Sequence, residues 1–279
     1  HQKIFNKLIT ASKQSDLSSL VLTFFPHPRV ILNKYKDIKM IDTLDEKIDH
    51  LEKIGIDHLI IHPFDKKFSL LSADQFIKEY LVEKLKLKHI IIGYDHRFGK
   101  GREASVTDLK EYSREFNFVV DEIDAQEIEK IAISSTKIRN SINEGDLKTT
   151  KIYLGRFFSL TGKVVKGDGL GKQIDYPTAN ISIEEDYKII PKDGVYYIKT
   201  TIDNNLYNGM MNIGHRPTIG TKEKSIEVNL FSFDKDIYDK VISVDVVEKI
   251  REEKKFSSIE ALKTQLAKDE EHCLKLINK

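Results

Sequence analysis

The sequence is poor in cysteine, in long apolar runs and in charge of one sign. A single cysteine, Cys273, stands in 279 residues, so no disulfide can form within the chain and a cysteine-based zinc site is not expected. No apolar run approaches the roughly 20 residues that cross a bilayer, and the chain does not open with a charged-then-apolar signal segment. These absences predict a protein of the reducing cytoplasm that has no membrane partner.

The charges of the chain are balanced. Lys and Arg number 45 against 44 Asp and Glu, which gives a formal net charge of +1. A balanced surface creates no long-range field for nucleic acid or for an anionic membrane. Nucleic acid is therefore not expected as a partner, and any site for an anion must be local.

The first half alternates short β-branched runs with amphipathic helical stretches, which is typical of β-α units on a parallel sheet. We expect strands at 20–24, 58–61, 89–92 and 118–120. We expect helices at 44–54 and 135–143, and a third that begins at a capping box of Ser72 and Gln75 and ends at about residue 85. Residues 1–14 place Ile4, Phe5, Leu8 and Ile9 on one helical face. Because a parallel sheet needs a strand before that helix, we expect a Rossmann-like α/β domain over residues 1–156 whose first strand is missing from this sequence.

After about residue 158 strands follow one another without helices between them. We expect them at 160–166, 195–202, 206–212, 226–231 and 241–250, followed by one long helix from 258 to 277. This order predicts a small β-barrel with a C-terminal helix over residues 157–279.

A glycine-rich loop opens the second half. Gly162, Gly167, Gly169 and Gly171 stand within ten residues, at the end of an expected strand. Such a loop allows backbone N–H groups to approach phosphate oxygens closely, and Lys163 adds local positive charge. A flexible hairpin connection explains the same glycines equally well if the loop is considered alone.

The sequence Pro-Thr-Ala-Asn follows at residues 177–180. Thr178 and Asn180 alternate along an extended stretch, so they point the same way. A hydroxyl and an amide oxygen are hard ligands that suit a Mg²⁺ ion bridging nucleotide phosphates. The loop and this tetrapeptide together predict a nucleotide site whose metal is held by Thr178 and Asn180.

These residues resemble the riboflavin kinase family, whose hallmark is a glycine-containing loop that runs into Pro-Thr-Ala-Asn. The resemblance covers the C-terminal half and implies a six-stranded barrel that binds ATP and riboflavin. It implies nucleotide contacts from Gly162, Lys163, Gly167, Gly169, Gly171, Pro177, Thr178 and Asn180, a catalytic base at Glu227 and a flavin contact at Arg251. One departure is Asp175, where the family usually has glycine; if the backbone there has a positive φ, aspartate tolerates it better than most residues.

Glu227 has two interpretations. It lies amid Ile226, Val228 and Leu230, where partial burial would raise its affinity for a proton and suit it to general-base catalysis. On strand alternation, however, it shares its face with Asn229, opposite those apolar residues, so the alternative is an exposed strand glutamate. The family resemblance favours the catalytic interpretation.

Three polar fragments of the first half follow expected strands or begin a helix, where ligands bind in open α/β sheets. They contribute Phe24, His27 and Pro28, then Asp95 and Arg97, then Ser135, Thr136 and Arg139. The last three predict a phosphate clamp at a helix N-terminus, with a plain Ser/Thr cap as the alternative.

This half resembles the FMN adenylyltransferase domain of bacterial bifunctional FAD synthetases, in which a His-x-Gly-His sequence opens the first helix. His1 followed by Gln2 resembles the end of that motif. The resemblance implies nucleotide and flavin contacts from His1 and from the eight residues of the three fragments, and we expect the first histidine of the motif to precede residue 1.

The leading hypothesis is a bifunctional cytoplasmic enzyme that uses ATP and Mg²⁺ to convert riboflavin to FMN and FMN to FAD. The first alternative is a riboflavin kinase with an inactive N-terminal domain. The second is a non-catalytic flavin-nucleotide sensor. Small molecules are the expected partners, and the chain is expected to be a monomer or a weak homo-oligomer.

Overall fold

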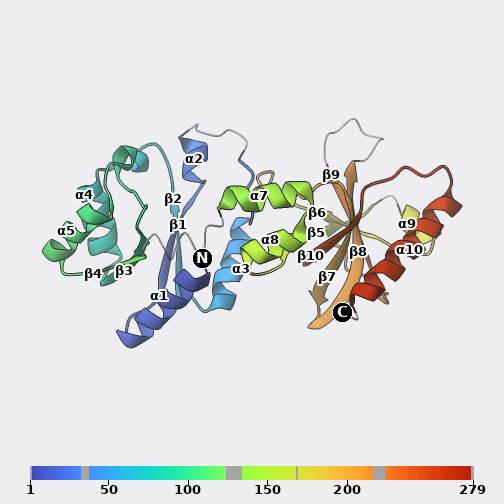
Figure 1. Cartoon of the computed structure of the whole chain (residues 1–279), viewed down its shortest axis with the longest axis horizontal. Coiled ribbons are helices and arrows are strands. Elements are labelled where there is room, and N and C mark those ends of the chain that lie inside the picture. The colour runs from blue at the N-terminus through green and yellow to red at the C-terminus, as the bar shows by residue number, and fades with distance from the viewer. Residues whose placement is uncertain (1, 33–37, 124–133, 168, 216–223, 278–279) are drawn as a thin grey trace. The chain divides into compact units, whose positions relative to one another are not determined.

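The computed structural model describes residues 2–32, 38–123, 134–167, 169–215 and 224–277 (Figure 1). The chain divides into two compact units. Unit 1 comprises His1–Ile38 and Lys47–Ala132, and unit 2 comprises Lys39–Glu46 and Ile133–Lys279. A short segment of the first half of the sequence therefore belongs to the same unit as the second half.

Unit 1 contains two parallel strand pairs with helices around them. β1 (Leu20–Phe25) pairs with β2 (His58–Pro63), and β3 (His89–Gly93) pairs with β4 (Val119–Ile123), both in parallel. The helical segments are α1 (Gln2–Gln14), α2 (Pro28–Ile31), η1 (Phe68–Leu70), α4 (Ala73–Gln75), the π-helix η2 (Phe76–Lys84), η3 (Lys100–Arg102) and α5 (Val106–Phe116). The expected α/β architecture with parallel strands is confirmed, and the Ser72 and Gln75 capping box is present.

Packing of η2 and α5 on the β3 and β4 pair forms the core of unit 1. Ile77, Leu109 and Phe118 are buried there together with Ile92 of β3. Helix α5 is not among the elements expected from the sequence, although Val106 and Leu109 on its buried face are spaced as in an amphipathic helix.

Unit 2 is built around a closed barrel of six strands in the order β10-β5-β6-β9-β8-β7, with antiparallel pairing throughout. The strands are β5 (Phe158–Val165), β6 (Ala179–Ser182), β7 (Gly194–Ile202), β8 (Asn205–His215), β9 (Lys224–Leu230) and β10 (Val241–Arg251). The helices are α7 (Ser135–Glu144), α8 (Leu147–Leu154), α9 (Leu170–Gln173) and α10 (Ile259–Ile277). The expected barrel with a C-terminal helix is confirmed.

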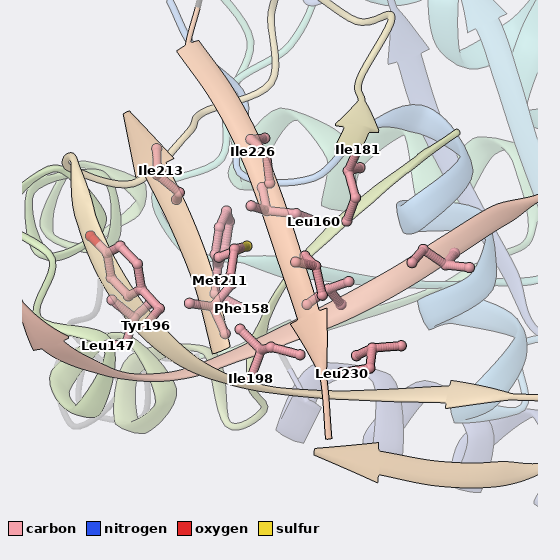
Figure 2. Packing of buried hydrophobic residues seen from close by; sticks show 14 of the residues in the cluster. Leu147, Phe158, Leu160, Ile181, Tyr196, Ile198, Met211, Ile213, Ile226 and Leu230 are labelled. Atoms are coloured by element: carbon pink, nitrogen blue, oxygen red, sulfur yellow. The ribbon is translucent and has the colours of Figure 1, made fainter. Parts of the chain in front are cut away.

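Strand alternation gives the barrel wall two different faces. Tyr196, Ile198, Met211 and Ile213 are fully buried and gather inside the barrel, as Figure 2 shows. Their neighbours on the outer face, such as Val195, pack instead against Cys273 of α10, as do Tyr197 and Met210. Successive residues of β7 therefore face the core and the outer side of the barrel in turn.

A buried ion pair ties Lys39–Glu46 to the barrel. The ammonium of Lys188 and the carboxylate of Glu46 are in contact, and their side chains are 0% and 2% exposed. The Lys188 ammonium also donates to the Ile41 carbonyl at 2.7 Å, while Glu46 accepts from the Thr161 N–H at 2.9 Å. Burial lowers the pKa of Lys188, and the attraction of Glu46 acts in the opposite direction.

The same carboxylate caps a helix. Glu46 stands in the first turn of α3 (Leu44–Ile54), where it accepts from the Thr43 N–H at 2.9 Å, while its own N–H donates to the Thr43 hydroxyl at 3.1 Å. This reciprocal pair is a capping box. Glu46 therefore fixes both the start of α3 and the position of the preceding segment.

We predict that Glu46→Gln will destabilise unit 2 by about 3–5 kcal/mol, because it leaves the Lys188 ammonium buried without its counter-charge. The measurement is the free energy of unfolding in urea. Adding Lys188→Met to this variant removes the stranded charge and is expected to recover at least half of the loss. A double variant no more stable than Glu46→Gln alone would show that the buried charge is not the cause.

Candidate active site

A cavity of about 240 Å³ lies against the outer face of the barrel, beside α10. We call it the Glu227 cavity. Thr178, Asn212, Glu227, Asn229 and Arg251 supply polar groups to it, and Ile174, Phe256, Leu262 and Leu266 supply apolar surface. A mostly apolar hollow with a few convergent polar groups is typical of a small-molecule site.

The polar groups converge because the strand register aligns them. Asn180 of β6 stands directly opposite Glu227 of β9, and Glu227 stands opposite Asn212 of β8. Val195 of β7 continues this row to Arg251 of β10. Directly opposed residues of antiparallel strands project from the same face, so one row around the barrel brings together side chains that are 71 residues apart in sequence, from 180 to 251.

Asn229 anchors the Pro-Thr-Ala-Asn segment. It lies two residues beyond Glu227 on β9, and its side-chain amide donates to the Pro177 carbonyl at 2.8 Å. The expected alternation is present, since Ile226, Val228 and Leu230 belong to the barrel core while Glu227 and Asn229 line the cavity. This bond holds Thr178 at the cavity wall.

Two glycines let the preceding loop approach this segment. A Cβ at Gly171 would lie 2.2 Å from the Tyr176 carbonyl oxygen and 3.2 Å from the Thr178 hydroxyl. A Cβ at Gly167 would lie 2.0 Å from the side-chain nitrogen of Asn180. The loop therefore reaches Thr178 and Asn180 in this arrangement only with glycine at these two positions.

Other residues of the glycine-rich stretch have different surroundings. Gly162 lies in β5, where an added Cβ would meet the Ser182 carbonyl at 2.4 Å, so it serves the contact between β5 and β6. Lys163 forms an ion pair with the exposed Asp239 at 2.8 Å. Gly169 has a left-handed backbone, φ +72°, at the start of α9.

The backbone at Asp175 adopts the left-handed conformation, with φ +63°, which aspartate tolerates better than most residues. Its carboxylate accepts from the ammonium of Lys263 on α10 at 2.8 Å. The next residue, Tyr176, donates its hydroxyl to Glu270 at 3.2 Å. Burial, followed by the nearby Glu270 charge, raises the pKa of Tyr176, so this phenol stays protonated at neutral pH.

Arg251 is held by a residue that sequence reasoning missed. Asp269 of α10 accepts from the Arg251 guanidinium at 2.7–3.0 Å, and Gln265 donates to the same carboxylate at 2.8 Å. The sequence does contain an indication of this residue, because Asp269 places a charge within the apolar stripe that Leu266 and Cys273 form along α10. Burial also raises the pKa of the Cys273 thiol to about 12, which makes it an inert packing residue.

A second cavity, of about 250 Å³, also borders the Pro-Thr-Ala-Asn segment. We call it the Phe233 cavity. Pro177, Thr178 and Lys172 line it together with Phe233 and Tyr238. Thr178 lines both cavities, so two ligands bound in them would meet at this residue.

In unit 1 the first candidate fragment begins in the last residues of β1 and continues into α2. Phe24 contacts Phe64 and Phe68, with ring centroids 5.5 and 5.3 Å apart. His27 caps α2 by accepting from the Arg29 N–H at 3.2 Å, and Pro28 is the first residue of that helix. Asp95 and Arg97 lie in the turn after β3, whereas His1 lies outside the described residues.

The third fragment belongs to unit 2. Ser134 is the N-cap of α7, so Ser135 and Thr136 occupy its first turn and are exposed. The guanidinium of Arg139 donates to the Lys39 carbonyl at 2.7 Å. The fragments therefore stand in different units, and a common site made by all three stays a prediction.

Clustered metal ligands and membrane-spanning helices are both absent from the described part of the chain. Within those ranges, no group of three or more His, Cys, Asp or Glu side chains could hold a metal ion. None of the helices in the same ranges is long and apolar enough to span a membrane.

Two families account for nearly the whole sequence. The model of the riboflavin kinase family matches residues 154–277, which include the barrel and both cavities, and that of the FAD synthetase family matches residues 1–137. These matches identify a flavin-nucleotide transferase with two enzyme modules.

Full-length relatives show how the modules combine. The chain is 37% identical to a bifunctional riboflavin kinase/FMN adenylyltransferase of Buchnera aphidicola, over 100% of this chain and 90% of the relative. It is 37% identical to the Listeria monocytogenes protein of the same name, over 97% and 86%. The chain belongs to the family of bifunctional riboflavin kinase/FMN adenylyltransferases.

A solved structure has the same fold. It is described as a macrolide-efflux protein from Streptococcus pneumoniae and is 33% identical, with a TM-score of 0.86 over 97% of this chain and 88% of that one.

We predict that Gly171→Ala will loosen the segment that carries Thr178. The Tyr176 N–H donates to the Gly171 carbonyl at 2.9 Å, and the added methyl group would force these residues apart. Hydrogen exchange at the Tyr176 amide should therefore accelerate. Gly169→Ala is the matched control, because an added Cβ there has nothing within 4 Å and introduces only left-handed backbone strain of about 1 kcal/mol. Equal exchange rates in the two variants would contradict the close packing at Gly171.

Proposed function

We propose that the chain makes flavin nucleotides in two steps. The domain at residues 157–279 transfers the terminal phosphoryl group of ATP to riboflavin, giving FMN and ADP. The domain at residues 1–156, with Ser135, Thr136 and Arg139 of α7, transfers AMP from a second ATP to FMN, giving FAD and pyrophosphate. The observation that carries the first step is that Thr178 lies at the wall shared by two cavities, one of which holds Glu227 and Arg251.

The two cavities suit the two kinase substrates. The Glu227 cavity combines the apolar surface of Phe256 and Leu262 with several polar groups, as a flavin ring carrying a polyhydroxyl chain requires. The Phe233 cavity has aromatic and aliphatic walls, which suit a purine. Its charged lining residues are Lys172, Lys235, Asp234 and Asp236. The glycine loop at Gly167 and Gly171 would bring backbone N–H groups to the transferred phosphate.

Glu227 is the proposed general base. As the terminal ribityl hydroxyl attacks the γ-phosphorus, its proton passes to the Glu227 carboxylate, the bond to the bridging oxygen breaks and ADP leaves. Asn180 and Asn212 flank Glu227 on the neighbouring strands, so they limit where the attacking hydroxyl can lie. Phosphoryl transfer depends mainly on such positioning and on charge stabilisation.

The Thr178 hydroxyl and the Asn180 amide oxygen are the proposed metal ligands. Two neutral oxygen donors beside the glycine loop fit a Mg²⁺ ion that keeps several waters and binds chiefly to the nucleotide phosphates. When bound, such an ion neutralises phosphate charge as it develops.

The adenylyl-transfer site is proposed at the carboxyl ends of β1 and β3. Phe24 lies at the end of β1, His27 and Pro28 follow it, and Asp95 and Arg97 follow β3. The aromatic cluster around Phe24 offers surface for a flavin or an adenine ring. His1 is proposed as a further phosphate contact, as the family resemblance implies.

We further propose that the chain works in the cytoplasm on small molecules alone, as a monomer or a weak homo-oligomer. Its balanced charge and its buried, unpaired cysteine support this setting.

We predict that Glu227→Gln will lower riboflavin phosphorylation roughly 10²–10⁴-fold, because glutamine cannot accept the hydroxyl proton. The measurement is single-turnover FMN formation with saturating ATP and riboflavin. Formation of FAD from added FMN by the same variant serves as the internal control and should be unchanged. Phosphorylation within about tenfold of the parent would eliminate Glu227 as the base.

We predict that Arg97→Ala will lower FAD formation from FMN at least tenfold, since removing one contact to the transition state commonly costs roughly 10²–10³-fold in rate. Riboflavin phosphorylation by this variant should stay at the parent rate. The parent chain must also form FAD from FMN and ATP if the proposed adenylyl transfer is correct. A parent chain that makes FMN but no FAD would support the kinase-only alternative.

A further inference from the structure

The face of α10 that packs on the barrel contains one buried charge. Asp269 is 2% exposed, and its neighbours on the same face are the apolar Leu266 and Cys273. A carboxylate at such a position is costly unless it is paired and fully hydrogen-bonded. Its presence therefore points to a specific partner.

That partner is Arg251 at the end of β10. The Arg251 Nε–H donates to both Asp269 oxygens, at 3.0 and 2.9 Å, and an Nη2–H donates to Oδ2 at 2.7 Å. Gln265, one turn earlier on α10, donates to Oδ1 at 2.8 Å. The carboxylate is thus held by the arginine on one side and by its own helix on the other, which fixes its orientation.

This pairing leaves part of the guanidinium for a ligand. Of the five N–H groups of an arginine, one on Nε and one on Nη2 go to Asp269, and one on Nη1 goes to the Glu252 carbonyl at 3.0 Å. Arg251 lines the Glu227 cavity, and the centre of the Phe256 ring lies 5.7 Å from its guanidinium carbon. The planar group is therefore held at the cavity wall with the remaining donors available to a bound molecule.

We infer that Asp269 is a positioning residue for the acceptor substrate, acting through Arg251 and itself oriented by Gln265. The inference rests on the proposed kinase function of the same cavity. An unheld arginine has several rotatable bonds and loses side-chain entropy when a ligand fixes it. Asp269 removes that cost before riboflavin binds, so the pair affects acceptor binding and leaves the chemistry at Glu227 unchanged.

The test is a double-mutant cycle on the full chain, read by riboflavin binding without nucleotide, as quenching of riboflavin fluorescence. Asp269→Asn should weaken binding about tenfold, because the amide loses one charge-assisted acceptor. Arg251→Ala should weaken it at least as much. If Asp269 acts through Arg251, the double variant binds no more weakly than Arg251→Ala alone.

Kinase kinetics separate positioning from general damage. With Asp269→Asn the KM for riboflavin should rise while kcat stays within about threefold of the parent. Asp269→Glu should recover part of the loss. The matched control is Glu271→Gln on the same helix, which breaks only the exposed pair with Lys275 and should leave binding unchanged.

A milder variant covers the case in which Asp269→Asn does not fold. Gln265→Ala keeps both charges and removes only the 2.8 Å hydrogen bond to Asp269. It should raise the KM for riboflavin roughly two- to fivefold, as the loss of one hydrogen bond predicts.

Additive losses in the cycle, a fall in kcat at unchanged KM, or an unaffected Gln265→Ala variant would overturn the inference. A parent chain that fails to bind riboflavin would overturn the proposed function as well.

Discussion

The pairing of β6 with β9 is the constraint on which the candidate kinase site depends. It sets Asn180 opposite Glu227, and the pairing of β9 with β8 sets Asn212 on the other side of the same carboxylate. A shift of one residue in either register would turn Glu227 into the barrel core and bring Ile226 or Val228 to the cavity. Closure of the barrel protects this register, because a closed sheet has no free edge along which a strand can slip.

The apolar core enforces the same arrangement from inside. Ile226 and Val228 pack with Met211 and Ile213 of the neighbouring strand, so burial of these residues specifies which face of β9 is polar. The outer face is then shaped by α10 and by the loop that precedes β6. Gly167 and Gly171 allow that loop to lie against Thr178 and Asn180, and Thr178 lines both cavities.

Much of this could be predicted from local patterns, because alternation is a property of neighbouring residues. The face shared by Glu227 and Asn229 and the long C-terminal helix follow from residue spacing. From the sequence, the left-handed backbone at Asp175 is expected only conditionally, because the related family usually has glycine there. The pairs of Asp269 with Arg251 and of Glu46 with Lys188 could not be predicted, since the two residues of each pair stand 18 and 142 positions apart in sequence.

The family resemblance places Lys163 at the nucleotide, whereas the structure pairs it with Asp239. The Rossmann-like half is the harder case, because its three candidate fragments depend on tertiary placement that spacing does not encode.

The central claim is spatial: a flavin and a nucleotide occupy the two cavities and meet at Thr178, with Glu227 facing the hydroxyl that is phosphorylated. A crystal structure of the full chain with riboflavin and a non-hydrolysable ATP analogue tests it most directly. The account predicts the terminal ribityl oxygen within about 3.2 Å of the Glu227 carboxylate, with the γ-phosphate on the other side of the Thr178 hydroxyl. A flavin bound elsewhere, or a Glu227 carboxylate turned away from the ribityl chain, would contradict it.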